Sequence, residues 1–368
     1  MAGGAAAAQY QGIESPDTTI SFPLAKINHF NKTTTFYIQN AGSAATTTGT
    51  ATFKMRNGDT HTYTLPSIGK GQMILFTAQD AGADPNNSVN DAKIGSLVVT
   101  ADQPLAGVVL EHYTTEDPAT ILQGARGFTS ADYDTTWYAP VTKNNRYGRF
   151  TGIQVQNVSG GSIDITVTYK GTAGACAGNT YTDSASSVAD GTSHTFLGTA
   201  VLPEDCTAAA TIVGTGNIVA IVNESFLKDH IPADGQQATT YDAFPAKAAT
   251  KTLSVPLYKE NRFNKTTGLQ VQNVGSNDAH VTLSFVCGST TYTTQQQTIS
   301  PGTSANYTRV SQNTSLWSGT VMPEDVNCAV TVTSADENIV GMANESVYPF
   351  SGAPIKQDKS NYEAFNLP

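Results

Sequence analysis

An eight-residue pattern recurs along the chain and sets its organisation. Residues 151–158 read TGIQVQNV, residues 267–274 read TGLQVQNV, and residues 35–41 carry the related TFYIQNA. Apolar and glutamine residues alternate in this pattern, which is typical of a β-strand with one buried face. The closing asparagines of the three copies are Asn40, Asn157 and Asn273, spaced 117 and then 116 residues apart. Such a spacing is one domain length and predicts three tandem repeats.

Each repeat is predicted to be a β-sandwich. Only 14% of the residues are charged, and threonine and valine are frequent where helix formers are sparse. About seven short strands in roughly 115 residues are typical of a two-sheet antiparallel sandwich. We therefore expect an all-β chain of three tandem immunoglobulin-like antiparallel β-sandwich domains. The expected units are a tail at 1–19, repeat 1 at 20–130, repeat 2 at 131–246 and repeat 3 at 247–368. Short links between the repeats predict a semi-rigid row.

Charge and hydropathy narrow the range of partners. The formal net charge of −10 argues against a nucleic-acid partner and against binding to an anionic membrane surface. Apolar runs are all shorter than the ~18 residues of a membrane-spanning helix, so we expect no membrane insertion.

The four cysteines predict disulfides. They are Cys176, Cys206, Cys287 and Cys328, two each in repeats 2 and 3. Four cysteines allow three pairings, and their shared placement favours Cys176–Cys206 and Cys287–Cys328, with free buried thiols as the alternative. A structural zinc site is excluded because the spacing lacks CxxC or clustered Cys/His pairs. Disulfides favour an oxidising compartment, and hence an extracellular or cell-surface location.

A lysine and a glutamate recur in every repeat. The lysines follow a proline near the repeat start, and the glutamates end its last apolar run. The residues are Lys26, Lys143 and Lys259, with Glu111, Glu224 and Glu345. One hypothesis is an intramolecular isopeptide bond from each lysine to Asn40, Asn157 or Asn273, with the glutamate relaying protons. The alternative is a buried ion pair that fixes the strand ends.

Catalysis, metals and cofactors are not expected. The six histidines share no position among the repeats, and HExxH and GxSxG patterns are both missing from the sequence. Acidic turns such as 80–91 and the two Pro-Glu-Asp turns could offer oxygen ligands to calcium, but none has the regular spacing of a calcium-binding loop. We therefore predict that the chain is not an enzyme and that it holds neither a metal nor a cofactor.

The repeats resemble those of a class of secreted bacterial proteins. The pattern T-G-[IL]-Q-V-Q-N-V, the element [VA]-N-E-S at 222–225 and 343–346, and a following Tyr-x-x-Phe are similar to tandem repeats of secreted bacterial cell-surface proteins of the sheath, surface-layer or filament type. Repeat 1 departs from the pattern, with Leu110-Glu111-His112 in place of the second element. The resemblance implies an extracellular structural or adhesive role and no reaction.

These features together predict a structural protein. Sandwiches have edge strands that can pair with another chain, so we expect a homo-oligomeric polymer built head to tail into a filament, sheath or surface layer. The tail is a candidate inter-subunit arm that would contact a neighbouring subunit. Its candidate contact residues are Ala5, Ala8, Tyr10 and Ile13. The alternative is a cell-surface adhesin or glycan-binding module, and a third interpretation is an accessory region of a secreted enzyme.

Overall fold

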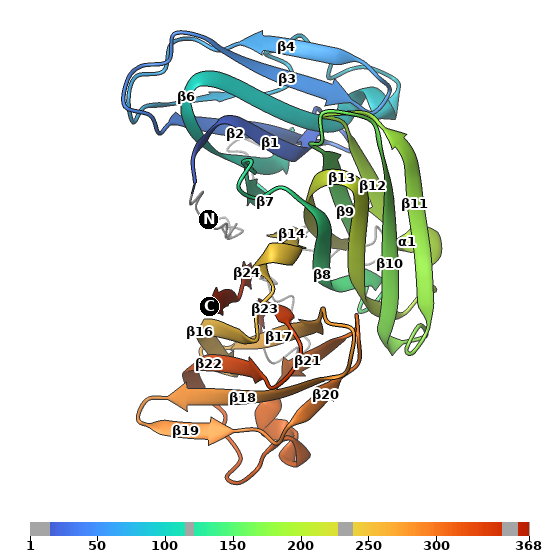
Figure 1. The fold of residues 1–368 in the computed structure, drawn as a ribbon, viewed down its shortest axis with the longest axis vertical. Coiled ribbons are helices and arrows are strands. Elements are labelled where there is room, and N and C mark those ends of the chain that lie inside the picture. Colours follow the sequence, from blue (N-terminus) through green and yellow to red (C-terminus); the bar gives the residue numbers. More distant parts are fainter. Residues whose placement is uncertain (1–14, 115–120, 227–237, 348–359, 368) are drawn as a thin grey trace.

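The structure is a computed structural model that describes residues 15–114, 121–226, 238–347 and 360–367. These residues form antiparallel sheets joined by turns and a few short helical segments (Figure 1). The all-β class predicted from the sequence is therefore confirmed. The sheets are sandwich-like, because strands that alternate buried and exposed residues pack around apolar cores.

Repeat 1 is organised around one long strand that pairs on both sides along its length. The strands of repeat 1 are β1 (Asp17–Lys26), β2 (Lys32–Asn40), β3 (Gly49–Met55), β4 (Thr60–Thr64), β5 (Met73–Phe76), β6 (Ile94–Tyr113) and β7 (Ile121–Arg126), and the 3-10 helix η1 (Asn90–Lys93) precedes β6.

Repeat 2 follows the same order. Its elements are β8 (Asp134–Asn144), β9 (Arg149–Asn157), β10 (Ile163–Gly174), β11 (Thr180–Val188), β12 (Ser193–Leu197), α1 (Gly198–Val201), β13 (Cys206–Phe226), β14 (Ala238–Asp242), β15 (Phe244–Pro245) and η3 (Ala246–Ala248).

Repeat 3 has the same pairing scheme with a divided long strand. Its elements are β16 (Thr252–Glu260), β17 (Lys265–Asn273), β18 (Ala279–Cys287), β19 (Thr290–Thr293), β20 (Gln297–Ile299), β21 (Ser304–Thr308), η4 (Val310–Gln312), η5 (Thr314–Leu316), β22 (Val326–Ser334), β23 (Ile339–Val347), β24 (Ser360–Glu363) and β25 (Phe365–Leu367).

The two apolar runs expected near the end of each repeat are joined in repeats 1 and 2. The first part of β6 pairs with β1 and β3, and its second part pairs with β2 and β7. The strand thus crosses from one sheet to the other without a turn, and β13 does the same. In repeat 3 a turn at 335–338 separates β22 from β23, because its polar residues interrupt the ladder.

The recurring asparagines close their strands by binding the turn that follows. The Asn157 side-chain amide donates to the carbonyls of Gly161 and Val188 at 2.6 and 2.8 Å, and its oxygen accepts from the Ser159 N–H at 2.9 Å. Asn40 and Asn273 make the same three kinds of bond. An asparagine satisfies backbone groups on both sides of the turn, which explains its recurrence.

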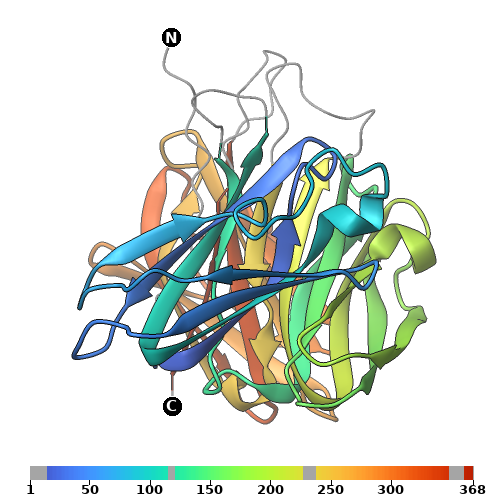
Figure 2. The same cartoon turned by 90° about the horizontal axis from the view of Figure 1, so that it is seen from above.

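The three repeats form an arc (Figure 1). Strands β7, β14 and β24 lie towards its inner side, where β14 contacts both of the others. Seen from above, repeat 1 lies in front and the strands of repeat 2 lie to its right (Figure 2). The arrangement is curved, whereas the short links alone predicted a row. One apolar core runs continuously through repeats 1 and 2 and includes Val340 and Met342 of repeat 3. The other buried apolar residues of repeat 3 form a second core.

In repeats 2 and 3 the glutamines of the recurring pattern are buried, against the expectation of one exposed face. In repeat 2, Gln154 and Gln156 are 1% and 0% exposed, although Ile153 and Val155 fill the core on the other side of the strand. Gln272 of repeat 3 is also 0% exposed. The polar face is covered by the preceding repeat. The alternation correctly predicts a strand, but the prediction that its polar face is exposed to solvent is wrong.

Candidate functional site: the joints between repeats

The joint between repeats 1 and 2 is polar and buried. Gln156 of β9 donates from Nε2 to the Leu97 carbonyl of β6 at 3.4 Å and to the Gly191 carbonyl of its own repeat at 3.0 Å. The same Gly191 carbonyl accepts from Ser96 Oγ of repeat 1 at 2.7 Å. In addition, Lys54 Nζ donates to the Asp190 carbonyl. A turn of repeat 2 is thus held by three side-chain groups.

The joint between repeats 2 and 3 repeats this chemistry. Gln272 of β17 donates to the Ala210 carbonyl of β13 at 3.2 Å. Lys170 Nζ donates to the Pro301 carbonyl at 2.7 Å, at the turn that precedes β21. A further bond joins Ser304 Oγ to the Pro140 carbonyl at 2.7 Å. Backbone carbonyls that the joint removes from water therefore accept hydrogen bonds from side chains of the other repeat.

Strand register shows that the two joints use equivalent positions. Gln156 pairs with Ser193, and Gln272 pairs with Ser304 at the same place in their ladders. On the other side, the residue opposite Lys54 is Ser96, and the residue opposite Lys170 is Ala209. Three register positions can thus be matched across repeats 1, 2 and 3, in that order. They are occupied by Gln39, Gln156 and Gln272; by Leu97, Ala210 and Val330; and by Lys54, Lys170 and Val286.

An ion-pair cluster reinforces the first joint on the inner side of the arc. Arg126 of β7 binds Asp132 through two bonds of 2.9 Å, and its Nε lies 2.9 Å from Asp242 Oδ2 of β14. Burial raises the pKa of Asp242 to about 6, although the Arg126 guanidinium opposes this. One guanidinium of repeat 1 therefore serves two carboxylates of repeat 2.

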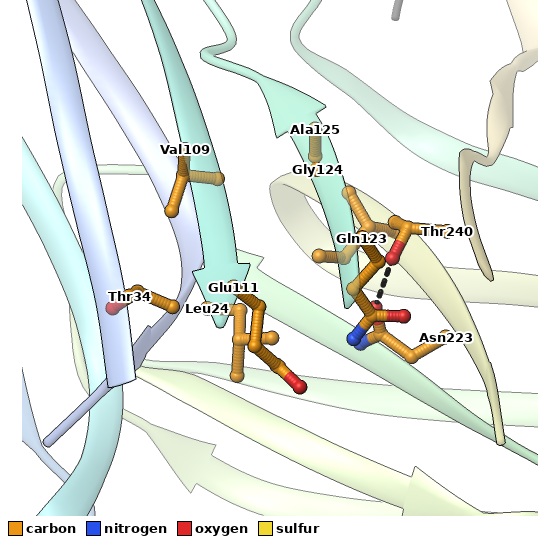
Figure 3. Close-up of a pocket in the computed structure, with 10 residues that line it drawn as sticks. Leu24, Thr34, Val109, Glu111, Gln123, Gly124, Ala125, Asn223 and Thr240 are labelled. Carbon is orange, nitrogen blue, oxygen red and sulfur yellow. Dashed lines mark hydrogen bonds between the residues drawn. The ribbon is translucent and has the colours of Figure 1, made fainter. Parts of the chain in front are cut away.

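A small pocket lies beside this cluster between β6, β7, β13 and β14 (Figure 3). Its lining includes Val109 and Ala125 together with Gln123, Asn223 and Thr240. Thr240 Oγ1 donates to Asn223 Oδ1 at 2.7 Å, as the dashed line in Figure 3 shows. The pocket has room for about one water molecule, so we do not assign it a ligand.

The recurring lysines and glutamates lie together in each repeat. Lys26 Nζ is 2.7 Å from Glu111 Oε2, and a second cation, Lys32, is 3.6 Å from Glu111 Oε1. The corresponding contacts in repeat 2 are Lys143–Glu224 at 2.7 Å and Arg149–Glu224 at 2.9 Å. Those in repeat 3 are Lys259–Glu345 at 2.5 Å and Lys265–Glu345 at 3.7 Å. We call these the cation–glutamate triads. The second cation of each triad, which is Lys32, Arg149 or Lys265, was not predicted from the sequence.

The triads are half-buried to buried and sit at the strand ends opposite to the asparagine turns. Burial by itself would raise the pKa of Glu111, but the ammonium groups of Lys26 and Lys32 outweigh it and hold the pKa at about 2. The Asn40 amide is bonded to its own turn, as described above, and the lysine binds the glutamate. These contacts are those of an ion pair.

Both disulfides pair as the spacing favoured. Cys176 is bonded to Cys206 and Cys287 to Cys328, with Cα atoms 5.3 and 4.2 Å apart. They close loops of 30 and 41 residues, worth about 3.5 to 4 kcal/mol each on a chain-entropy estimate. Disulfides are typical of proteins that fold in oxidising compartments.

An exposed aromatic ring also recurs between the first two strands of each repeat. Tyr147 and Phe263 are strongly exposed, and the guanidinium groups of Arg146 and Arg262 lie 4.7 and 4.5 Å from the ring centroids. Phe30 is exposed at the corresponding turn. The backbone there has positive φ at all three aromatic residues. The sequence motif Asn-[His/Arg]-[Phe/Tyr] was visible, but nothing in it indicated that the ring points outwards.

Metal-binding clusters, membrane-spanning helices and the predicted inter-subunit arm remain to be considered. The candidate arm residues Ala5, Ala8, Tyr10 and Ile13 are outside the part of the chain that the structure describes. Within that part, no group of three or more His, Cys, Asp or Glu side chains could hold a metal ion. A search of the same residues finds no helix with the length and apolar character to span a membrane.

Comparison with known proteins leaves the chain unassigned to a family. No family model matches the sequence, and no curated protein matches it. Among solved structures, a serine-rich repeat protein from Streptococcus agalactiae is 8% identical, with 71% of this chain and 85% of that chain covered and a TM-score of 0.13. A triple jelly-roll turret protein of an archaeal virus is 13% identical over 89% of this chain and 81% of that chain, with a TM-score of 0.11. Scores this low do not describe a shared fold.

Proposed function

We propose that this chain is an extracellular structural protein that assembles head to tail into a filament, sheath or surface layer. The observation that carries the proposal is the repeated joint. Lys54 and Lys170 each reach a turn carbonyl of the following repeat, and Gln156 and Gln272 are fully buried against the preceding one. A module that stacks on its own kind twice within one chain suits an assembly that continues the same stacking between chains.

The chemistry elsewhere fits a load-bearing role. Two disulfides and three cation–glutamate triads tie the ends of long strands together. In the described residues, the clusters of titratable groups are engaged in ion pairs between strands and repeats. The low charge and the oxidised cysteines support the extracellular placement.

Electron microscopy of the native secreted material at neutral pH, without fixation, tests this function. We expect regular filaments, tubes or sheets with a repeat related to the three-repeat arc. Dispersed single arcs at all protein concentrations would contradict the proposal.

The exposed aromatic turns favour one second candidate, a glycan-binding adhesin. A ring is exposed at the same turn of each repeat, and an arginine flanks it in repeats 2 and 3, so these rings can stack on a sugar face. A glycan array would test this candidate with the wild type and with a Tyr147→Ala, Phe263→Ala double variant. Binding that the double variant loses would favour the adhesin, and an array without any bound glycan would contradict it.

A further inference from the structure

We propose that the two ends of the molecule form a third joint with a second copy of this chain. This inference rests on the proposed head-to-tail function and names the surfaces that perform it. The head face belongs to repeat 1 and consists of Tyr37, Gln39, Gly71, Met73 and Leu75. The tail face belongs to repeat 3 and consists of Leu257, Val286, Ala329 and Thr331.

The head face occupies the position that repeats 2 and 3 bury in their joints. Gln39 pairs with Met73 across β2 and β5, as Gln156 and Gln272 pair with their serines. Whereas those two glutamines are 0% exposed, Gln39 is exposed. Gly71, whose N–H binds the Asn40 carbonyl, corresponds to Gly191 in the first joint and is also exposed.

The tail face is the matching surface at the other end of the molecule. Ala329 lies opposite Val286 in the ladder of β22 and β18, just as Ser96 lies opposite Lys54 in repeat 1. Ser96 and its counterpart Ala209 in repeat 2 are 0% exposed because the next repeat covers them. Ala329 is exposed, and so is Thr331.

Both end faces carry apolar side chains where the internal joints carry polar ones. Met73 and Leu75 are 55% and 57% exposed. Their counterparts are Ser193 and Thr195 in repeat 2 and Ser304 and Asn306 in repeat 3. On the tail face, Val286 is 46% exposed and stands where repeats 1 and 2 have Lys54 and Lys170, and Leu257 is 41% exposed.

This substitution pattern indicates association between separate molecules. Inside the chain the linker and the shared apolar core hold repeats 1 and 2 together, so the residues at these register positions can be polar. Two separate chains lose translational freedom on binding and need apolar burial to offset that loss. Exposed apolar residues grouped at the two ends of a repeat array are the expected signature of such a contact.

The second copy is the favoured occupant because the surfaces equivalent to the two faces already bind each other at both joints within this chain. By equivalence with Gln156–Leu97 and Gln272–Ala210, Gln39 would donate to the Val330 carbonyl of the second copy. Val286 would pack against the turn at Gly71, where Lys54 meets Asp190 in the first joint. Head and tail are different surfaces, so the contact is heterologous and each molecule can bind two others.

Sedimentation velocity on two variants and their mixture tests the contact. Leu75→Glu places a charge on the head face, and Ala329→Arg places one on the tail face. Both residues are exposed, so neither change should disturb the fold. Burying an unpaired charge should weaken association at least about 100-fold, leaving each full-length variant monomeric where the wild type assembles.

The mixture separates a head-to-tail contact from other geometries. The Leu75→Glu chain keeps an intact tail, and the Ala329→Arg chain keeps an intact head, so an equimolar mixture should form dimers and nothing larger. Assembly of either variant alone at wild-type concentrations would overturn the proposed faces. A matched control is Val89→Glu, at an exposed apolar residue outside both faces, which should assemble as the wild type does.

The outcomes also distinguish this inference from the proposed function. If the wild type polymerises and the variants do so equally well, the structural function stands and these faces are wrong. If the wild type forms only closed two-chain rings that the variants abolish, the contact is right and the filament function is wrong. A wild type that stays monomeric at every concentration overturns both.

Discussion

At the scale of single residues, the cation–glutamate triads place a largely buried charge cluster at the same strand ends in every repeat. Glu111 is 2% exposed and has two ammonium groups beside it, at 2.7 and 3.6 Å. The Glu111 carboxylate neutralises the charges of two ammonium groups that are largely removed from water. Its removal would leave both lysines without a counter-charge. The triads therefore hold β1, β2 and β6 together at one end of repeat 1, as the asparagine turn does at the other.

Replacement of this carboxylate is expected to be strongly destabilising. We predict that Glu111→Gln lowers the free energy of unfolding by about 3–5 kcal/mol, because the two lysines stay buried without a partner charge. Urea denaturation followed by circular dichroism measures the change. The matched control is Asp205→Asn at the exposed Arg146–Asp205 pair, where the loss should stay below about 1 kcal/mol. Equal losses in the two variants would contradict the buried-triad assignment.

The same carboxylate predicts an acid-dependent stability. The pKa of Glu111 is held at about 2 in the folded chain, below its ordinary value of 4.5. A depressed pKa stabilises the folded state above pH 4.5, and this stabilisation is lost as the pH falls towards 2. The stability difference between wild type and Glu111→Gln should therefore narrow between pH 4.5 and pH 2. Denaturation series at several pH values would show it, and a constant difference across this range would contradict the prediction.

At the scale of elements, the strands that carry the recurring glutamines differ in what covers them. Strand β17 places Gln272 in a joint, and strand β2 places Gln39 on a free face. The same residue at the same register position thus has two environments in one chain. A comparison of the two strands isolates the contribution of the joint from that of the strand.

Truncation of these glutamines should therefore have unequal effects. We predict that Gln272→Ala costs about 2–3 kcal/mol, because it removes the bond to the Ala210 carbonyl and leaves a cavity. Gln39→Ala, the matched control, should change the stability of the monomer by less than about 0.5 kcal/mol. Thermal unfolding of both variants, measured at concentrations where the chain is monomeric, provides the comparison. A loss in Gln39→Ala as large as that in Gln272→Ala would show that the strand, and not the joint, needs the glutamine.

The elements also show what the sequence could and could not predict. Alternation around Ile153 and Val155 identified strand β9 and its core face, because that period depends only on local geometry. The burial of Gln154 and Gln156 could not be predicted, because it comes from another repeat. The continuity of β6 through both sheets was likewise missed, since two apolar runs with polar residues between them resemble two strands. The disulfide pairs were accessible because both repeats place their cysteines alike.

The sequence identified some residues of the candidate site, but not the contacts that they make. Lys26 and Glu111 were identified by recurrence, and their ion pair was one of two hypotheses. Lys32 was overlooked because an arginine replaces it in repeat 2 and hides the recurrence. The joints were not predicted at all, because Lys54 and Ser96 have no motif and act only through the position of a neighbouring repeat.

At the scale of the whole molecule, the buried apolar residues that the structure describes form two cores and not three. Phe128 at the end of repeat 1 packs edge-on against Trp137 of repeat 2, with ring centroids 5.6 Å apart, inside one continuous apolar cluster. Most of repeat 3 packs around Trp317 in a separate cluster, and Val340 and Met342 of its strand β23 belong to the first cluster. Cooperative unfolding follows shared burial, so repeats 1 and 2 should behave as one unit and repeat 3 as another.

The two tryptophans of the chain report on these units separately. In a Trp317→Phe variant, Trp137 follows repeats 1 and 2, and in a Trp137→Phe variant, Trp317 follows repeat 3. We expect the Trp317 signal to change at a lower urea concentration and with a smaller slope, because the core around it is smaller and less surface becomes exposed on unfolding.

A change in the core of repeat 1 identifies which repeats unfold together. Phe53→Leu alters a fully buried ring in repeat 1, far along the chain from either tryptophan. If the core is continuous, this change lowers the midpoint seen by Trp137 of repeat 2 and leaves the Trp317 midpoint in place. Coincident transitions at both reporters would mean that the second joint, with its hydrogen bonds and the apolar contacts of Val340 and Met342, couples repeat 3 as tightly as the shared core couples the other two.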